Sequence, residues 1–179
     1  MSSSADVVSK NLIEIFGCVP DYDTYTDPEA IRCSEDAYRV ALALLAKSWG
    51  DQLLEIIEQP PSPLTSREVH TLDALIGKVS AVINQLNDLD RARTLGPHGR
   101  RHTALGECDA TILKAVEETA RRMQQISGPR NINLWLKDNA APVYRRLRRL
   151  GEDIARRNQV LRARRHPWRD DSPSLGNRL

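Results

Sequence analysis

Residues 38–57, YRVALALLAKSWGDQLLEII, decide the fold. Their large apolar side chains recur at steps of three and four residues, which is the spacing of one buried face of an α-helix. These side chains are Tyr38, Leu42, Leu45, Trp49, Leu53 and Ile56. An Asp-Pro-Glu start signal at 27–29 precedes this stretch and a proline cluster at 60–63 follows it, so the sequence predicts one long helix over 28–58.

The same periodicity recurs in the rest of the chain. A capping box at 65–68 begins a helix that is expected to end near residue 93. Another apolar stripe spans 105–126. A short segment at 132–137 leads to Pro142, where the last long helix is expected to begin.

These patterns define a fold class. No stretch shows the sustained alternation of apolar and polar residues that a strand needs. With a short first helix at 5–16, the sequence predicts a single all-α bundle of four long helices plus short ones over residues 1–165, followed by a flexible tail at 166–179. A length of 179 residues with 40% hydrophobic and 28% charged residues suits one soluble globular domain.

The net charge of +2 hides an uneven distribution. Residues 1–60 carry four Lys or Arg against eleven Asp or Glu, a net of −7, whereas residues 144–179 carry eleven Arg against four acids, a net of +7. Opposite charge at the two ends favours either packing of one end against the other or a basic face left free for a partner.

No catalytic residue, metal or cofactor is expected, and we predict that the chain is not an enzyme. His98, His102 and Cys108 are metal-ligand types, but His98 lies between two glycines and Cys108 falls on an apolar stripe. Glu117 and Glu118 are adjacent, so on a helix they point about 100° apart. The sequence holds no nucleophile elbow, phosphate-binding Gly-rich loop or di-iron Glu-x-x-His pair.

The compartment is predicted from the cysteines and the start of the chain. The three cysteines form no CxxC pair, and the first sixteen residues lack the apolar run of a secretory signal. Charged residues also interrupt every apolar stretch before it reaches the roughly 18 residues of a spanning helix. We therefore expect a cytoplasmic protein with reduced thiols, and a peripheral location where it meets membranes.

Arginines crowd the last helical stretch. Six of them are candidate anion contacts: Arg145, Arg146, Arg148, Arg149, Arg156 and Arg157. They could neutralise the phosphates of nucleic acid or of an anionic membrane surface, or they could form a solvated face that pairs with the acidic first third of the chain. Aromatic residues interleaved with the basic ones, which single-strand binding requires, are absent.

Four segments, in order, resemble the HeLo domain, the helical effector domain of fungal prion-controlled incompatibility and cell-death proteins. Residues 15–25, IFGCVPDYDTY, are similar to that family's Leu-Phe…Cys-Val…Phe/Tyr segment. Residues 43–51, ALLAKSWGD, resemble its Leu-Ser-Arg-Trp-Gly-Glu signature, and 72–86 corresponds to an apolar helix of the family. Residues 134–138, LWLKD, resemble its Trp-Ala-Leu-x-Asp turn.

The resemblance implies an all-α regulatory or effector domain in heterokaryon incompatibility or programmed cell death. Its N-terminal region would be released to engage a membrane, under the control of a neighbouring or C-terminal amyloid-forming segment. Here the N-terminal helix carries Asp6, Lys10 and Glu14. This amphipathic helix is expected to lie on a membrane surface, because spanning the bilayer with these charges is costly.

The resemblance also implies roles for particular residues. Phe16, Tyr22 and Tyr25 are expected to latch the N-terminal helix onto the bundle. Trp49, Gly50 and Trp135 are expected to hold the bundle together. The expected partner is a protein, either a second copy or a signalling receptor with an amyloid motif, with an anionic membrane surface as a further partner. The alternative function is phosphate binding on nucleic acid through the Arg-rich helix.

Overall fold

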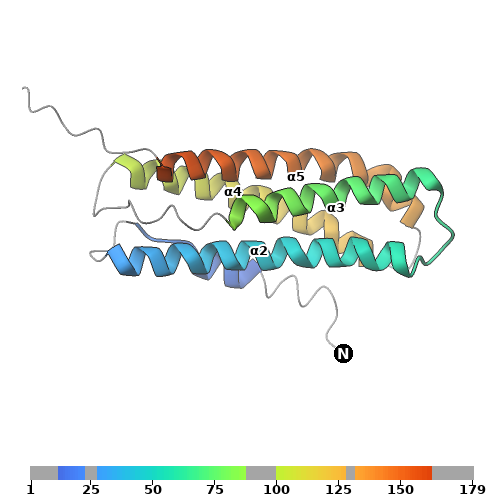
Figure 1. Cartoon of the computed structure of the whole chain (residues 1–179), viewed down its shortest axis with the longest axis horizontal. Helices are drawn as coiled ribbons and strands as arrows, with labels where there is room; N and C mark the ends of the chain where they lie inside the picture. The colour runs from blue at the N-terminus through green and yellow to red at the C-terminus, as the bar shows by residue number, and fades with distance from the viewer. Residues whose placement is uncertain (1–11, 23–27, 88–99, 128–131, 163–179) are drawn as a thin grey trace, which may run out of the picture.

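The computed structural model describes residues 12–22, 28–87, 100–127 and 132–162. Four long helices lie side by side along one axis (Figure 1). They are α2 (Pro28–Glu58), α3 (Ser66–Leu86), α4 (Arg100–Gln124) and α5 (Ile132–Arg162), with a 3-10 turn, η2 (Gln125–Ser127), after α4. Residues 12–18 form a short helix. The described ranges contain helices and no strand, which confirms the all-α bundle.

The helix that decides the fold forms as predicted. All six residues of its apolar stripe are buried, and both Tyr38 and Leu53 are fully covered. α3 packs on α2 and on α5, and α5 packs also on α4. Trp49 and Trp135 both belong to the main apolar core, and Gly50, the residue after Trp49 in α2, is also buried. A Cβ on Gly50 would lie 3.4 Å from Val79 Cγ1, at van der Waals contact, so α2 and α3 lie close together at this glycine.

The capping box at the start of α3 also forms as predicted. The Thr65 hydroxyl accepts a hydrogen bond from the Glu68 amide, and the Glu68 carboxylate accepts one from the Thr65 amide at 2.7 Å. The end of α3 differs from the prediction, because the helix stops at Leu86 and Asn87 caps it. Residues 88–99, which include the predicted end near residue 93, lie outside the described ranges.

The predicted helix start at Pro142 is wrong. α5 begins at Ile132 and continues through this proline to Arg162. A proline inside a helix costs about 3 kcal/mol because it removes one backbone hydrogen bond and crowds the preceding turn. The segment before it stays helical because Ile132, Trp135, Leu136 and Ala140 are all buried in the core.

The first described segment, residues 12–22, packs onto the long helices, with Leu12, Cys18 and Val19 partly buried against the main core. Ile15 is 1% exposed and belongs to the main core, and Tyr22 packs with Ile31, Leu105 and Leu161 in a smaller apolar cluster. Phe16 is 51% exposed, so its expected role as a latch is wrong. The short helix turns Ile15 toward the core and its neighbour away from it. Tyr25, like the tail at 166–179, lies outside the described ranges.

Candidate functional site

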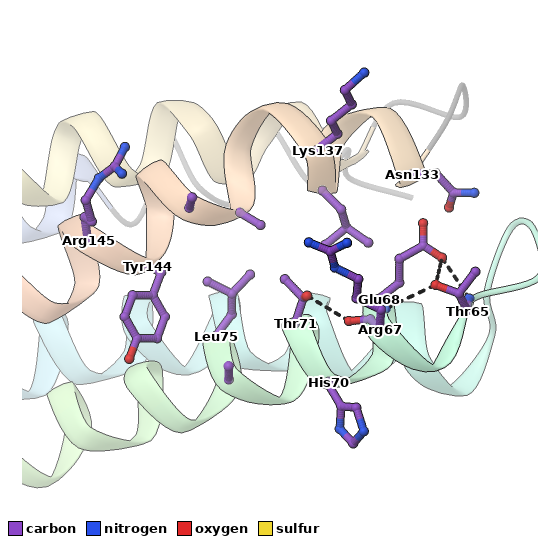
Figure 2. Close-up of a pocket in the computed structure, with 14 residues that line it drawn as sticks. Thr65, Arg67, Glu68, His70, Thr71, Leu75, Asn133, Lys137, Tyr144 and Arg145 are labelled. Atoms are coloured by element: carbon purple, nitrogen blue, oxygen red, sulfur yellow. Dashed lines mark hydrogen bonds between the residues drawn. The ribbon is translucent and has the colours of Figure 1, made fainter.

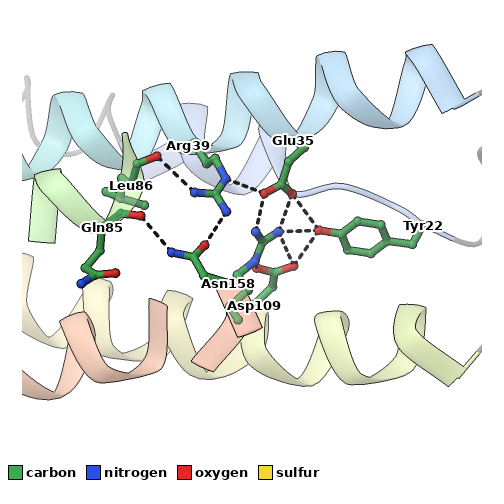
Figure 3. Close-up of polar contacts among 8 residues, drawn as sticks. Tyr22, Glu35, Arg39, Gln85, Leu86, Asp109 and Asn158 are labelled. Atoms are coloured by element: carbon green, nitrogen blue, oxygen red, sulfur yellow. Dashed lines mark hydrogen bonds and ion pairs between the residues drawn. The ribbon is translucent and has the colours of Figure 1, made fainter. Parts of the chain in front are cut away.

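The most distinctive site is a buried ionic network at one end of the bundle (Figure 3). Arg157 of α5 stands at its centre and bonds carboxylates from two other helices. Its Nε donates to Asp109 Oδ1 of α4 at 2.5 Å, and its Nη2 donates to Glu35 Oε2 of α2 at 2.6 Å. Nη2 also donates to the Tyr22 hydroxyl. One guanidinium therefore joins three elements that are far apart in the sequence.

A second arginine extends the network to the end of α3. Arg39 Nε donates to Glu35 Oε1 at 2.6 Å, and its Nη2 donates to Asn158 Oδ1 at 2.6 Å. Its Nη1 donates to the Leu86 carbonyl, and the Asn158 amide donates to the Gln85 carbonyl. These two bonds satisfy carbonyls in the last turn of α3, which have no partner within the helix.

Every member of the network is buried, yet its charges balance. Glu35, Asp109 and Arg157 are each at most 2% exposed, and Arg39 is 4% exposed. Two guanidinium groups face two carboxylates, so no net charge is buried. The Tyr22 hydroxyl donates to Glu35 Oε2 at 3.1 Å and to Asp109 Oδ2 at 3.3 Å. Buried ions are tolerated when they are paired and hydrogen-bonded in this way.

The network shifts the pKa of each acid in a direction that its contacts explain. Burial alone raises the pKa of Glu35, but hydrogen bonds and attraction from Arg157 and Arg39 outweigh it and lower that pKa to about 2. Burial raises the pKa of Asp109, and Arg157 offsets only part of that effect. Burial also raises the pKa of Tyr22 above its usual value, so this phenol stays protonated and donates.

Sequence reasoning missed this network, although the sequence carries a signal for it. Glu35 lies three residues before Tyr38, in phase with the buried stripe of α2. Asp109 follows Leu105 by four residues, and Arg157 follows Ile154 by three, so both are also in phase with apolar stripes. A charged residue at a buried helical phase needs a partner of opposite charge in the core.

The structure separates the six arginines predicted to contact anions. Arg145, Arg148, Arg149 and Arg156 are exposed on one side of α5. Arg146 is half-buried and pairs with Glu118 of α4. Arg157 is 2% exposed inside the network, so its predicted contact with an external anion is wrong. It points inward because it lies at the same helical phase as Ile154 and Leu161, which are both buried.

Within the described ranges, the network joins the acidic first third of the chain to the basic last helix, and Glu35 with Arg157 is the ion pair that does so. The outer side of α2 carries further acids together with three exposed apolar side chains, Val40, Leu44 and Leu54. α3 packs on both α2 and α5 and lies between them (Figure 1).

Two grooves flank α5. The first, about 1070 Å³, lies between the N-terminal halves of α3 and α5, and its floor includes Leu75, Leu136 and Ala140 (Figure 2). Lys137 and Arg145 stand along its rim. The second, about 920 Å³, lies between α4 and α5 and is rich in basic residues. Neither groove is lined by the carboxylates or guanidinium groups of the buried network.

The candidate metal ligands are not brought together. His98 lies outside the described ranges, and nothing is described of the His102 side chain. Cys108 is half-buried on α4, where burial raises its thiol pKa. Within the ranges that the structure describes, no group of three or more His, Cys, Asp or Glu could hold a metal ion. Likewise, none of the described helices is long and apolar enough to cross a membrane.

Together, the fold and the site define an all-α helical bundle clamped by a buried ionic network, with a basic face on its last helix. Comparison with protein-family models, curated proteins and solved structures finds no match to this chain. The resemblance to the HeLo domain therefore rests on the four sequence segments alone.

Proposed function

We propose that the chain is a non-enzymatic helical regulatory domain of the HeLo type that acts through protein contacts and at anionic membrane surfaces. The observation that carries this proposal is the basic face of α5. Arg145, Arg148, Arg149 and Arg156 are exposed there, and the helical repeat places all four on one side. Among them, only Arg148 forms an ion pair within the described ranges, a loose one with Glu152 at 3.4 Å.

The first described segment supports an effector role. Residues 12–22 rest on the long helices chiefly through Ile15 and Tyr22. On the same short helix, Ile13 is 73% exposed and Phe16 is 51% exposed. If this segment undocked, Ile15 would become exposed beside Ile13 and Phe16 and would enlarge their apolar surface. An amphipathic segment of this kind binds at the surface of a bilayer.

The groove between α3 and α5 supports contact with a protein partner. Apolar side chains form its floor and cations stand along its rim (Figure 2). A groove of this composition suits an amphipathic helix with acidic residues beside its apolar face. The outer side of α2, with Leu44 and Asp51 both exposed, has that character, so a second copy of this chain is one partner that fits.

The membrane proposal is tested by neutralising the basic face. The triple variant Arg145→Gln, Arg149→Gln and Arg156→Gln should bind phosphatidylserine vesicles about a hundredfold more weakly than the parent chain, because each basic residue near the surface contributes about 1 kcal/mol. Binding is measured by vesicle co-sedimentation at several salt concentrations.

A matched control removes the same charge elsewhere. The variant Arg32→Gln, Lys47→Gln and Arg67→Gln changes two exposed cations and the half-buried Arg32, all outside α5, and should bind vesicles nearly as well as the parent chain. Equal losses for both triple variants would contradict a specific basic face. Undetectable binding of the parent chain at low salt would contradict the membrane proposal itself.

The same basic face is the observation that favours the alternative, phosphate binding on nucleic acid. Such binding must weaken steeply with salt, with a slope set by the number of phosphates neutralised. A titration of the parent chain with duplex and single-stranded DNA decides between the two functions. Tighter binding to DNA than to vesicles, lost in the α5 variant and kept in the control, would establish the alternative.

The latch is tested with Tyr22→Ala. Removing this buried ring should undock residues 12–22, so their backbone amides exchange faster with solvent while those of α3 stay protected. Leakage from phosphatidylserine vesicles should rise. Leu134→Ala, which removes an exposed apolar side chain from α5 outside both grooves, should change neither measurement. An undocked segment without any increase in leakage would contradict the latch.

A further inference from the structure

The groove between α4 and α5 has an unusual mixture of charges. Its lining includes Ala110, Thr111 and Ala115 of α4 and Pro142 of α5. Seven charged side chains complete the lining: Lys114, Glu118, Arg122, Arg145, Arg146, Arg149 and Asp153. Its volume, about 920 Å³, lies within the usual range for small-molecule sites of about 300–1,000 Å³.

The two acids of this groove, Glu118 and Asp153, cancel only part of its basic charge. Arg146 pairs with Glu118, and Arg122 donates to Asn139 at 2.8 Å. The other three cations, Lys114, Arg145 and Arg149, are exposed and form no ion pair within the described part of the chain. A ligand with an anionic group would therefore meet an ammonium and two guanidinium groups, the donors that bind phosphate best.

Asp153 gives the groove a second requirement. Asp153 is only 7% exposed, and its Oδ2 atom is buried with no hydrogen-bond partner among the described residues. Buried polar atoms nearly always have a partner, and leaving one without a partner is costly. An ionised carboxylate only accepts hydrogen bonds, so the missing partner must be a donor.

Neither a simple anion nor a simple cation satisfies both requirements. Inorganic phosphate would meet the cations but would be repelled by Asp153. A polyamine would pair with Asp153 but would be repelled by Lys114, Arg145 and Arg149. A molecule that carries both phosphate and hydroxyl groups meets each requirement with the matching group.

We propose that the α4–α5 groove binds a phosphorylated polyol. Its phosphate pairs with Lys114, Arg145 and Arg149, and a neighbouring hydroxyl donates to Asp153 Oδ2. The same chemistry occurs in the headgroup of a phosphoinositide and in soluble inositol or sugar phosphates. Binding of the soluble form does not depend on the proposed membrane function.

The binding test uses the full chain and isothermal titration calorimetry with myo-inositol 1,4,5-trisphosphate. The trisphosphate should bind, whereas unphosphorylated myo-inositol should give no signal. Arg149→Gln should weaken trisphosphate binding about tenfold or more, because it removes a charge-assisted contact. The matched control is Arg148→Gln, which changes the adjacent exposed arginine outside the groove and should leave the affinity within about twofold.

Asp153 supplies a readout that nonspecific charge attraction would not give. Asp153→Ala should bind inorganic phosphate more tightly, because a repelling charge is gone. Its preference for the trisphosphate over inorganic phosphate should fall about tenfold, because the hydroxyl loses its acceptor. If the alanine variant does not fold, Asp153→Leu nearly keeps the size of the side chain, also lacks an acceptor, and should show the same directions.

Vesicles distinguish the two sources of the ligand. If the groove takes a lipid headgroup, the chain should prefer phosphoinositide vesicles to phosphatidylserine vesicles of equal charge, and soluble trisphosphate should displace it. Trisphosphate binding without that preference assigns the groove to a soluble compound.

Three results would overturn the inference: no binding of trisphosphate at low salt, equal losses for Arg149→Gln and Arg148→Gln, or an unchanged preference in both Asp153 variants. Phosphatidylserine binding without trisphosphate binding would leave the proposed function standing and remove only the groove ligand.

Discussion

Arg157→Met should lower the free energy of unfolding by about 3–5 kcal/mol, the usual result of removing one partner from a buried ion pair. The variant leaves the fully covered Glu35 and the 1% exposed Asp109 without the guanidinium that bonds them both. Methionine fills much of the volume of the arginine stem, so most of the loss should come from the two carboxylates. Urea unfolding followed by circular dichroism measures it.

The adjacent residue provides the control. Arg156 is exposed on the same turn of α5, so Arg156→Met should change stability by less than about 0.5 kcal/mol. A loss of similar size for both variants would contradict the role assigned to Arg157. A combined variant, Asp109→Asn and Arg157→Met, should recover part of the loss, because Arg39 still pairs with Glu35 and no unpaired charge stays buried at this point.

Measuring stability at low pH distinguishes an electrostatic cause of the stability loss in Arg157→Met from a loss of packing. In the parent chain the pKa of Glu35 is lowered to about 2, so its stabilisation is complete above its unfolded pKa near 4.5 and is lost as pH falls toward 2. Without Arg157, burial raises the pKa of Asp109 further, whereas Arg39 still bonds Glu35, and the variant gains relative stability as Asp109 becomes protonated. The difference between the two proteins should therefore shrink between pH 7 and pH 4. A difference that does not change with pH would indicate lost packing alone.

More of the fold than of the buried network could be predicted from the sequence, because the helices follow from local patterns and the network depends on contacts between distant residues. Helical periodicity is local, and it placed the six side chains of the α2 stripe correctly. Pairing is not local: Arg157 lies 48 residues from Asp109 and 122 from Glu35. When its partner is not known, a charged residue at a buried position of a helix looks like a break in the apolar stripe. For this reason the sequence predicts Arg157 at the surface.

The errors at Phe16 and Pro142 have a related cause. A rotation of about 100° around the helix axis separates Ile15 from Phe16, and only the packing of 12–22 on the long helices decides which of them is covered. A proline is a strong local signal for a helix start, but four buried side chains before Pro142 hold that segment in the helix. In both cases tertiary contacts outweigh a local preference.

Trp49→Ala should be the second strongly destabilising substitution, with a loss of about 3–5 kcal/mol from the large cavity it leaves in the core. Trp49 is 1% exposed and is among the largest fully buried side chains. Thermal and urea unfolding measure the loss. Leu44→Ala on the exposed side of the same helix is the control and should change stability far less.

Replacing each core tryptophan by phenylalanine tests how much of its contribution to stability comes from packing and how much from the indole N–H group. The Trp49 Nε1 is buried without a hydrogen-bond partner among the described residues. Trp49→Phe therefore removes an unsatisfied donor whose burial costs about 1–3 kcal/mol, and this gain offsets part of the lost packing. The Trp135 Nε1 donates to the Arg122 carbonyl at 3.2 Å, so Trp135→Phe loses a bond as well as packing. Trp135→Phe should therefore destabilise the bundle more than Trp49→Phe, even though Trp135 is the more exposed of the two. The reverse order would mean that packing volume at the α2–α3 contact outweighs the unsatisfied donor.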